Sequence, residues 1–264
     1  MSTQLVTEQP LQLTATEFDV LWEHLELGPM PLVIKVPSPG RTFTERRGIE
    51  RKTWDDLEER GLGRQVGLDP MLERMLRTLA RPDQEVDGRL WLGRKIRVLA
   101  ATRDDLSVLA VLDGGTLSLY PATTGSLPRL AVGVLDHRQA GSGRSVTLRS
   151  ADLDAGAEAA ATAPGGLAGA LVQRGVRPED ADMLAGMVLG AQQRGQFGAA
   201  IRDRWARRHR ADRVIGFFDT ERGRYAQTRR PAPDGVLWSA IYPVDDRRLI
   251  AQLEELLTEL GLAK

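Results

Sequence analysis

The sequence contains no cysteine and only three histidines. Disulfides, thiolate nucleophiles and cysteine metal sites are therefore excluded. The three histidines, His24, His137 and His209, do not have the spacing of metal ligands, so each is expected to be structural. No GxSxG elbow occurs, and no glycine-rich loop has the spacing that phosphate binding needs. We therefore predict that the protein is not an enzyme and carries no metal or cofactor.

Long apolar runs are missing as well. No stretch of about 18 apolar residues exists, so we expect no membrane insertion. The N-terminal stretch up to Phe18 lacks a basic region followed by an apolar core, so we expect no secretory signal. A cytoplasmic location fits the absence of cysteine. The 36 basic and 36 acidic residues give a net charge of zero, which argues against a protein that coats nucleic acid.

Two groups of short apolar segments, separated by turn residues, predict two four-stranded antiparallel meanders. Asp113-Gly114-Gly115 and Asp234-Gly235 are typical of tight hairpin turns. The first meander is expected at residues 85–92, 96–101, 106–112 and 116–120, and the second at residues 197–201, 214–218, around Tyr225, and at residues 236–242.

Helix signals surround these meanders. Thr14 with Glu17, and Thr42 with Glu45, have the spacing of a capping box, and Asp69-Pro70 is typical of a helix start. Further helices are expected at residues 127–135, 151–161, 167–174 and 179–192, and a long one from Asp245 to a cap at Gly261. We also predict a buried strand at residues 32–36 and a flexible hinge at residues 141–143.

The chain repeats its plan. LQLTATEFD at residues 11–19 aligns without a gap with VTLRSADLD at residues 146–154. Each half then reads as strand, helices, meander and helix. We predict an α+β fold: a central, mostly antiparallel sheet built from two duplicated halves, about 1–140 and 144–264. These halves would be related by a pseudo-two-fold axis, flanked by helical bundles, and joined in a single domain over residues 1–264.

An arginine cluster near residues 202–213 offers an alternative function. Arginines interleaved with an aromatic side chain can bind single-stranded nucleic acid by charge and stacking. The same arginines can instead cover an apolar strand with their stems. The cluster comprises Arg202, Arg204, Arg207, Arg208, Arg210 and Arg213, with Trp205 among them.

The second meander also carries a family resemblance. RGQFG at 194–198, VIGFFDT at 214–220 and GRY at 223–225 resemble the EspG family of actinobacterial proteins associated with type VII (ESX) secretion. Other stretches agree in order along essentially the whole chain, among them LTATEFDVLWEHLELG near the start and YPVDDRRLIAQLEELL near the end. The resemblance implies a cytosolic, non-enzymatic chaperone with a central antiparallel sheet, helical bundles and quasi-two-fold symmetry. Mycobacterial members bind the helical tip of a PPE protein in a PE–PPE heterodimer.

This resemblance implies a PPE-like or another helical secreted protein as the partner, and no nucleic acid. The chaperone itself is expected to be a monomer or a homodimer. We place the partner-binding surface on the second-half sheet and the C-terminal helix, with Trp205 as the strongest candidate because tryptophan is enriched at binding hot spots. The candidate residues are Phe197, Ile201, Trp205, Trp238, Ile250 and Leu253.

Overall fold

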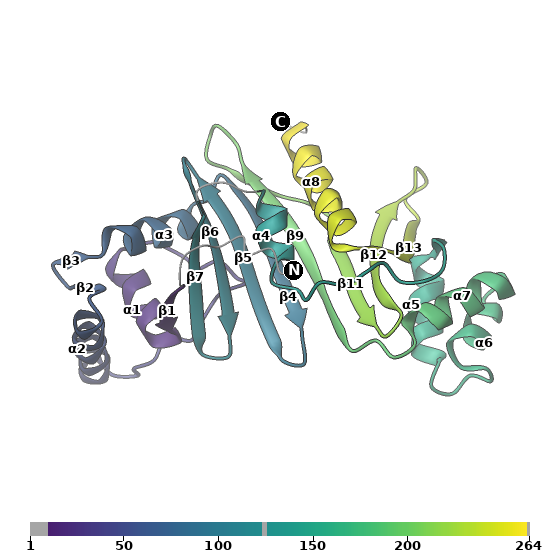
Figure 1. Cartoon of the computed structure of the whole chain (residues 1–264), viewed down its shortest axis with the longest axis horizontal. Helices are drawn as coiled ribbons and strands as arrows, with labels where there is room; N and C mark the ends of the chain where they lie inside the picture. The colour runs from purple at the N-terminus through teal and green to yellow at the C-terminus, as the bar shows by residue number, and fades with distance from the viewer. Residues whose placement is uncertain (1–9, 123–125, 263–264) are drawn as a thin grey trace.

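One broad antiparallel sheet organises the molecule (Figure 1), as expected for an α+β fold with a central sheet. The structure is a computed structural model, and it describes residues 10–122 and 126–262. The prediction about a secretory signal falls largely on residues 1–9, outside this range. The sheet has 11 strands in the order β1-β7-β6-β5-β4-β9-β11-β12-β13-β8, with β10 also pairing β9. Every strand pair in it is antiparallel.

The strands of the large sheet are β1 (Leu11–Thr14), β4 (Gln84–Trp91), β5 (Lys95–Arg103), β6 (Leu106–Asp113), β7 (Thr116–Ala122), β8 (Val146–Arg149), β9 (Gln193–Arg202), β10 (Arg208–Arg210), β11 (Ile215–Thr220), β12 (Gly223–Pro231) and β13 (Leu237–Pro243). A separate two-stranded sheet pairs β2 (Gly63–Arg64) with β3 (Gly67–Leu68). The helices are α1 (Ala15–His24), α2 (Phe43–Glu59), α3 (Pro70–Ala80), α4 (Leu127–Val132), α5 (Ser150–Ala159), α6 (Gly166–Val172), α7 (Pro178–Val188) and α8 (Asp246–Leu262).

The two predicted meanders meet at the centre of the sheet. Strand β4 pairs with β9 over its whole length, from Gln84 opposite Ile201 to Trp91 opposite Arg194. Strand β1 pairs with β7 at one edge, and β8 pairs with β13 at the other. In each half, therefore, the first strand lies against the last strand of the meander. The pseudo-two-fold axis and the single domain stay predictions.

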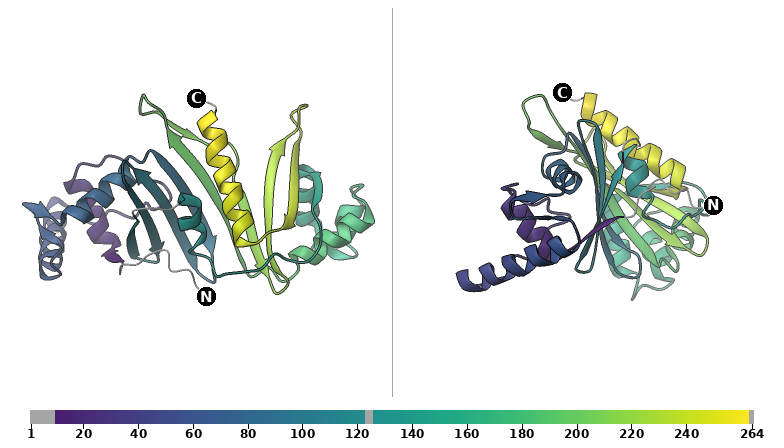
Figure 2. Two further views of the ribbon diagram at one scale, coloured as in Figure 1. Left: turned by 45° about the horizontal axis from the view of Figure 1, so that its top comes forward. Right: turned by 60° about the vertical axis from the view of Figure 1, so that its left-hand side comes forward.

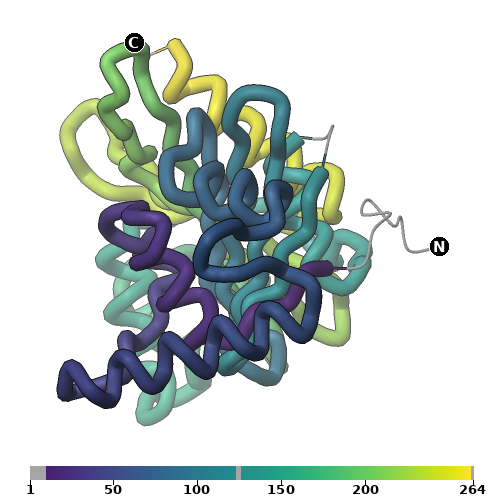
Figure 3. Tube along the Cα trace, turned by 90° about the vertical axis from the view of Figure 1, so that its left-hand side faces the viewer, coloured from purple at the N-terminus to yellow at the C-terminus, as the bar shows by residue number. Residues whose placement is uncertain are grey.

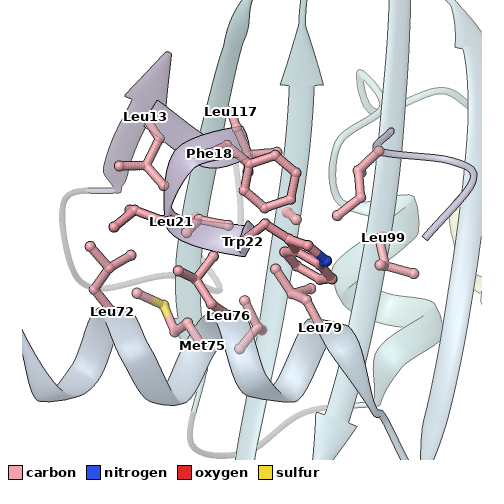
Figure 4. Close-up of a cluster of buried hydrophobic side chains, with 14 of the residues drawn as sticks. Leu13, Phe18, Leu21, Trp22, Leu72, Met75, Leu76, Leu79, Leu99 and Leu117 are labelled. Atoms are coloured by element: carbon pink, nitrogen blue, oxygen red, sulfur yellow. The ribbon is translucent and has the colours of Figure 1, made fainter. Parts of the chain in front are cut away.

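The helices cover the sheet unevenly (Figure 2). By strand register, α1–α3 and α5–α7 pack on the same face, at its two ends, while α4 and α8 pack on the middle of the opposite face. Phe18 and Trp22 of α1 meet Leu76 and Leu79 of α3 over the first end (Figure 4). Figure 3 shows α2 extending along the outside of that end. In the described part of the chain, no helix has the length and apolar character needed to cross a membrane.

Local signals set the helix starts. The Thr14 hydroxyl accepts a hydrogen bond from the Glu17 N–H at 3.1 Å, and the Glu17 carboxylate accepts one from the Thr14 N–H at 2.6 Å. Thr42 and Glu45 form the same capping box at the start of α2. Asp69 caps α3 at the Leu72 N–H. All three predicted starts are confirmed.

Three local predictions are wrong. Residues 32–36 form a turn and a loop rather than a strand, because Ile34 and its neighbours pack directly into the α1–α3 core, and flanking Pro31 and Pro37 cannot donate to a ladder. Gly261 does not cap α8, which continues to Leu262. The predicted hinge at residues 141–143 is held in place, since the Gly141 N–H donates to the Arg224 carbonyl at 2.9 Å and the Tyr225 hydroxyl donates to the Ser142 carbonyl at 3.0 Å.

A buried arginine holds the linker between the two halves, which is the segment between α4 and β8, in place. Arg224 is fully buried and donates to both carboxylate oxygens of Asp219, at 2.7 and 2.9 Å. It also donates to Asp246, at the start of α8, at 2.5 Å and to the Asp136 carbonyl at 2.9 Å. The Arg224 N–H donates to the Gln139 carbonyl. Strand β12, helix α8 and the linker therefore meet at one side chain.

Candidate functional site

The middle of the face that carries α1–α3 and α5–α7 is left uncovered. Side chains alternate along the central strands, so Val86, Leu90 and Phe197 pack under α4 and α8 on the opposite face. Their neighbours Arg89 and Gln196 point to the uncovered side and are exposed. The strands thus form the floor of an open groove between the two helical ends of the sheet.

We call this feature the central groove. It has a volume of about 710 Å³, and its floor comes from β4, β5, β9 and β11. The last turn of α7 and the residues that follow it form one wall. The lining residues used below are Arg89, Trp91, Lys95, Arg97, Arg194, Gln196, Val188 and Phe218.

The charges of the central groove are of one sign. Arg89, Lys95, Arg97 and Arg194 all line it, and the described lining includes no Asp or Glu. The indole of Trp91 lies among them and is 39% exposed. An open, basic groove with an aromatic side chain is suited to binding an anionic, partly apolar partner.

The sequence analysis did not select these residues. Their signal is the alternation in KIR at 95–97, where apolar Ile96 separates two basic residues, and in RLW at 89–91, where Leu90 separates Arg89 from Trp91. Alternation predicts one covered and one uncovered face. It does not reveal that helices cover both ends of the second face and leave its middle open, because that depends on tertiary packing.

Most of the predicted partner-binding residues are not on the surface. Phe197, Ile201 and Leu253 are buried, with Phe197 and Leu253 in the core beneath α4 and α8, and Ile250 is half-buried against the same core. Strand β9 turns Phe197 towards α8, and Leu253 of α8 turns inward to the same core. They form core rather than an accessible surface, which corrects the placement drawn from the sequence.

Two predicted residues do reach solvent. Trp205, in the turn between β9 and β10, is 64% exposed, and the Arg204 guanidinium lies 4.0 Å from its ring centroid. Trp238, near the start of β13, is 37% exposed beside Val236 and Leu237. Partner binding at either tryptophan stays a prediction.

We expect Trp205→Ala to change the free energy of unfolding by no more than about 0.5 kcal/mol, because the side chain is exposed. If the tryptophan is a partner contact, binding should weaken by about 10-fold or more. Thermal unfolding and partner titration measure the two effects separately. A large loss of thermal stability would place Trp205 in the core instead.

At least half of the arginine cluster is neutralised within the protein. Arg208 pairs with Glu85, Arg210 with Asp87, and Arg213 with Glu259. Arg202 donates to the backbone carbonyls of Pro82 and Ala206, at 3.2 and 2.8 Å. These contacts weaken the alternative of nucleic-acid binding, since half of the cluster already has carboxylate partners.

A glycine of the RGQFG segment makes room for one of these pairs. The Arg210 guanidinium lies across Gly198 on its way from β10 to Asp87 on β4, and an added Cβ at Gly198 would collide with it. The segment therefore has a packing reason to carry glycine at this position.

The β9–β10 turn is organised by Asp203. Its carboxylate accepts from the His209 ring at 2.8 Å and from the N–H groups of Trp205 and Arg207, both at 2.9 Å. The His209 contact, followed by the backbone N–H bonds, lowers the pKa of Asp203 to about 2. The pKa of an unfolded aspartate is near 3.9, so the lowered pKa in the folded state stabilises the fold at pH values above about 3.9. This stabilisation is lost as the pH falls through the pKa of the folded state.

We therefore expect the turn to keep its order from neutral pH to about pH 4 and to lose it as pH falls towards 2. The measurement is an NMR titration of the Asp203 side-chain carboxyl carbon together with the Trp205 indole signal. The variant Asp203→Asn should show the low-pH indole signal already at neutral pH. A titration midpoint near 3.9 would contradict the assigned contacts.

No constellation for metal binding appears in the described structure: no three His, Asp or Glu side chains are grouped so that they could hold an ion. His137 and His209 pair instead with Asp246 and Asp203, and His24 packs edge-on against Trp54.

Comparison with known proteins gives a consistent result. A model of the EspG family matches residues 14–255. The structure of the Mycobacterium tuberculosis type VII secretion system chaperone EspG5, solved in complex with the PE25-PPE41 dimer, matches with a TM-score of 0.71. The match has 16% sequence identity and covers 94% of this chain and 95% of that chain, so it concerns the fold. No curated protein matches the chain significantly by sequence.

Proposed function

Because the chain belongs to the EspG family, we propose that it is a chaperone of a type VII secretion system. It binds the helical tip of a PPE-type or other helical client, keeps that client soluble, and delivers it for export. It acts in the cytoplasm, where the client is met before secretion, and by binding rather than catalysis. The observation that carries this proposal is the family match over residues 14–255.

The central groove gives the proposal a physical basis. An exposed apolar helix tip promotes aggregation unless another surface covers it. A rigid groove that presents apolar side chains can receive the apolar face of a helix. Phe218 and Val188 offer such contacts, and the sheet beneath them is fixed by pairing on both sides of β4 and β9. The fold is shared with a chaperone that was solved with a PE25-PPE41 dimer, which supports a client of this kind.

The test is co-purification from the native host with the full-length tagged chain. We expect a stoichiometric complex with a helical type VII substrate, identified by mass spectrometry and sized by light scattering. The same client, expressed alone, should aggregate, and addition of the chain should prevent this. Recovery of nucleic acid alone, or a client that stays soluble without the chain, would contradict the proposal.

A further inference from the structure

The central groove places like charges directly opposite one another. Arg97 on β5 faces Arg89 on β4 across the strand pair. In the next row Trp91 has Lys95 on one side and Arg194 on the other. Like charges opposite each other in a sheet are destabilising. The arrangement therefore costs folding free energy unless something else interacts with it.

The protein itself does little to neutralise these charges. Arg89 lies 3.8 Å from the carboxylate of Asp87, which is already held by Arg210. Among the described residues, Arg97 donates only to the Lys35 carbonyl, at 3.4 Å. Within residues 10–122 and 126–262, Lys95 and Arg194 form no ion pair. The chain has as many acidic as basic residues, so this local excess is not a consequence of composition.

The groove also offers apolar contacts beside its cations. The Trp91 indole lies between Lys95 and Arg194, and Phe218 and Val188 line the same groove. A partner that neutralises the cations and also covers the apolar side chains must present carboxylates next to an apolar ridge. An amphipathic helix with acidic flanks does so, because side chains three and four residues apart share one face.

We propose that the central groove binds an acidic amphipathic helix of the client, with its apolar ridge on Trp91, Phe218 and Val188 and its carboxylates on the four cations. This inference rests on the proposed chaperone function and adds the charge that the client helix must carry. A nucleic acid fits less well, because the groove has apolar walls and the chain as a whole is neutral.

The test uses the full chain and a labelled synthetic helical peptide with leucine on one face and glutamate on its flanks. A second peptide carries lysine in place of each glutamate. Fluorescence anisotropy measures binding at low and physiological salt. We expect the acidic peptide to bind, with affinity that falls as salt rises, and the basic peptide not to bind.

The decisive variant is Lys95→Glu/Arg194→Glu, which alters two exposed side chains that hold no ion pair with any described residue. We expect it to weaken acidic-peptide binding by about 10-fold or more, since steering by a charged cleft is worth about 10 to 1,000-fold in association rate. It should also gain binding to the basic peptide. The control Arg51→Glu/Lys52→Glu makes the same net change on exposed residues of α2 and should bind as the native chain does.

The proposal would be overturned if the groove variant bound the acidic peptide as tightly as the native chain does. It would also be overturned if the groove variant and the control variant lost affinity for this peptide equally. Tighter binding of a single-stranded oligonucleotide, lost in the same groove variant, would overturn it in favour of nucleic acid. If the native client binds the groove variant at full affinity, the charge inference falls and the chaperone function stands. If no client is recovered at all, the chaperone function falls.

Discussion

We expect Arg224→Met to lower the free energy of unfolding by about 3–5 kcal/mol, the usual cost of removing one partner from a buried ion pair. Methionine keeps much of the side-chain volume but leaves Asp219, which is buried, without its cation. Asp246 loses its 2.5 Å contact at the start of α8, and the Asp136 carbonyl in the linker loses a donor.

Urea unfolding followed by circular dichroism measures the effect. The control is Arg222→Met, two residues away and exposed, which should change stability by no more than about 0.5 kcal/mol. The double variant Arg224→Met/Asp219→Leu should recover part of the loss, because the unpaired buried carboxylate is removed. A loss of less than about 1 kcal/mol in Arg224→Met would show that Arg224 does not fasten the linker.

The second large effect is expected for Phe197→Ala, which should lower the free energy of unfolding by about 3–5 kcal/mol. The ring is fully buried and stacks on Phe217 with centroids 5.8 Å apart. It also lies against Gly88, where an added Cβ would come within 2.8 Å of the ring. Alanine would leave a cavity between β4, β9 and β11 that rigid neighbours cannot fill.

Chemical denaturation of Phe197→Ala and Trp205→Ala compares a buried aromatic with an exposed one on the same hairpin. The expected result is a large loss for the first and almost none for the second. If Phe197→Ala has the same free energy of unfolding as the native chain and yet loses client binding, Phe197 is a surface contact, as the sequence analysis proposed.

Much of the fold is predictable because its signals are local. A threonine and a glutamate three residues apart satisfy each other's backbone N–H groups wherever they occur, so the starts of α1 and α2 follow from the sequence. Alternation and turn residues locate the meander strands, and the repeated strand and helix point to two matching halves. The apolar run at 32–36 is different: Val33, Ile34 and Val36 are buried as expected, but by packing in a loop, and Leu32 is exposed.

The partner surface was harder to predict, for a physical reason. Alternation along β9 separates Phe197 from Gln196, but whether α8 covers one side or the other depends on contacts distant in sequence. The family signature does not separate the two kinds of position either. Asp219, Arg224 and Tyr225 within it are buried, whereas Arg194, Gln196 and Phe218 within it line the central groove.

Hydrogen–deuterium exchange of the purified complex with its client tests the central claim most directly. We predict slower exchange, relative to the free chain, at residues 89–97 of β4 and β5, at residues 188–196 around the start of β9, and no change in α2. Slower exchange confined to α2 or to the outer edge strands β1 and β8, with the central groove unchanged, would contradict the claim that the central groove receives the client.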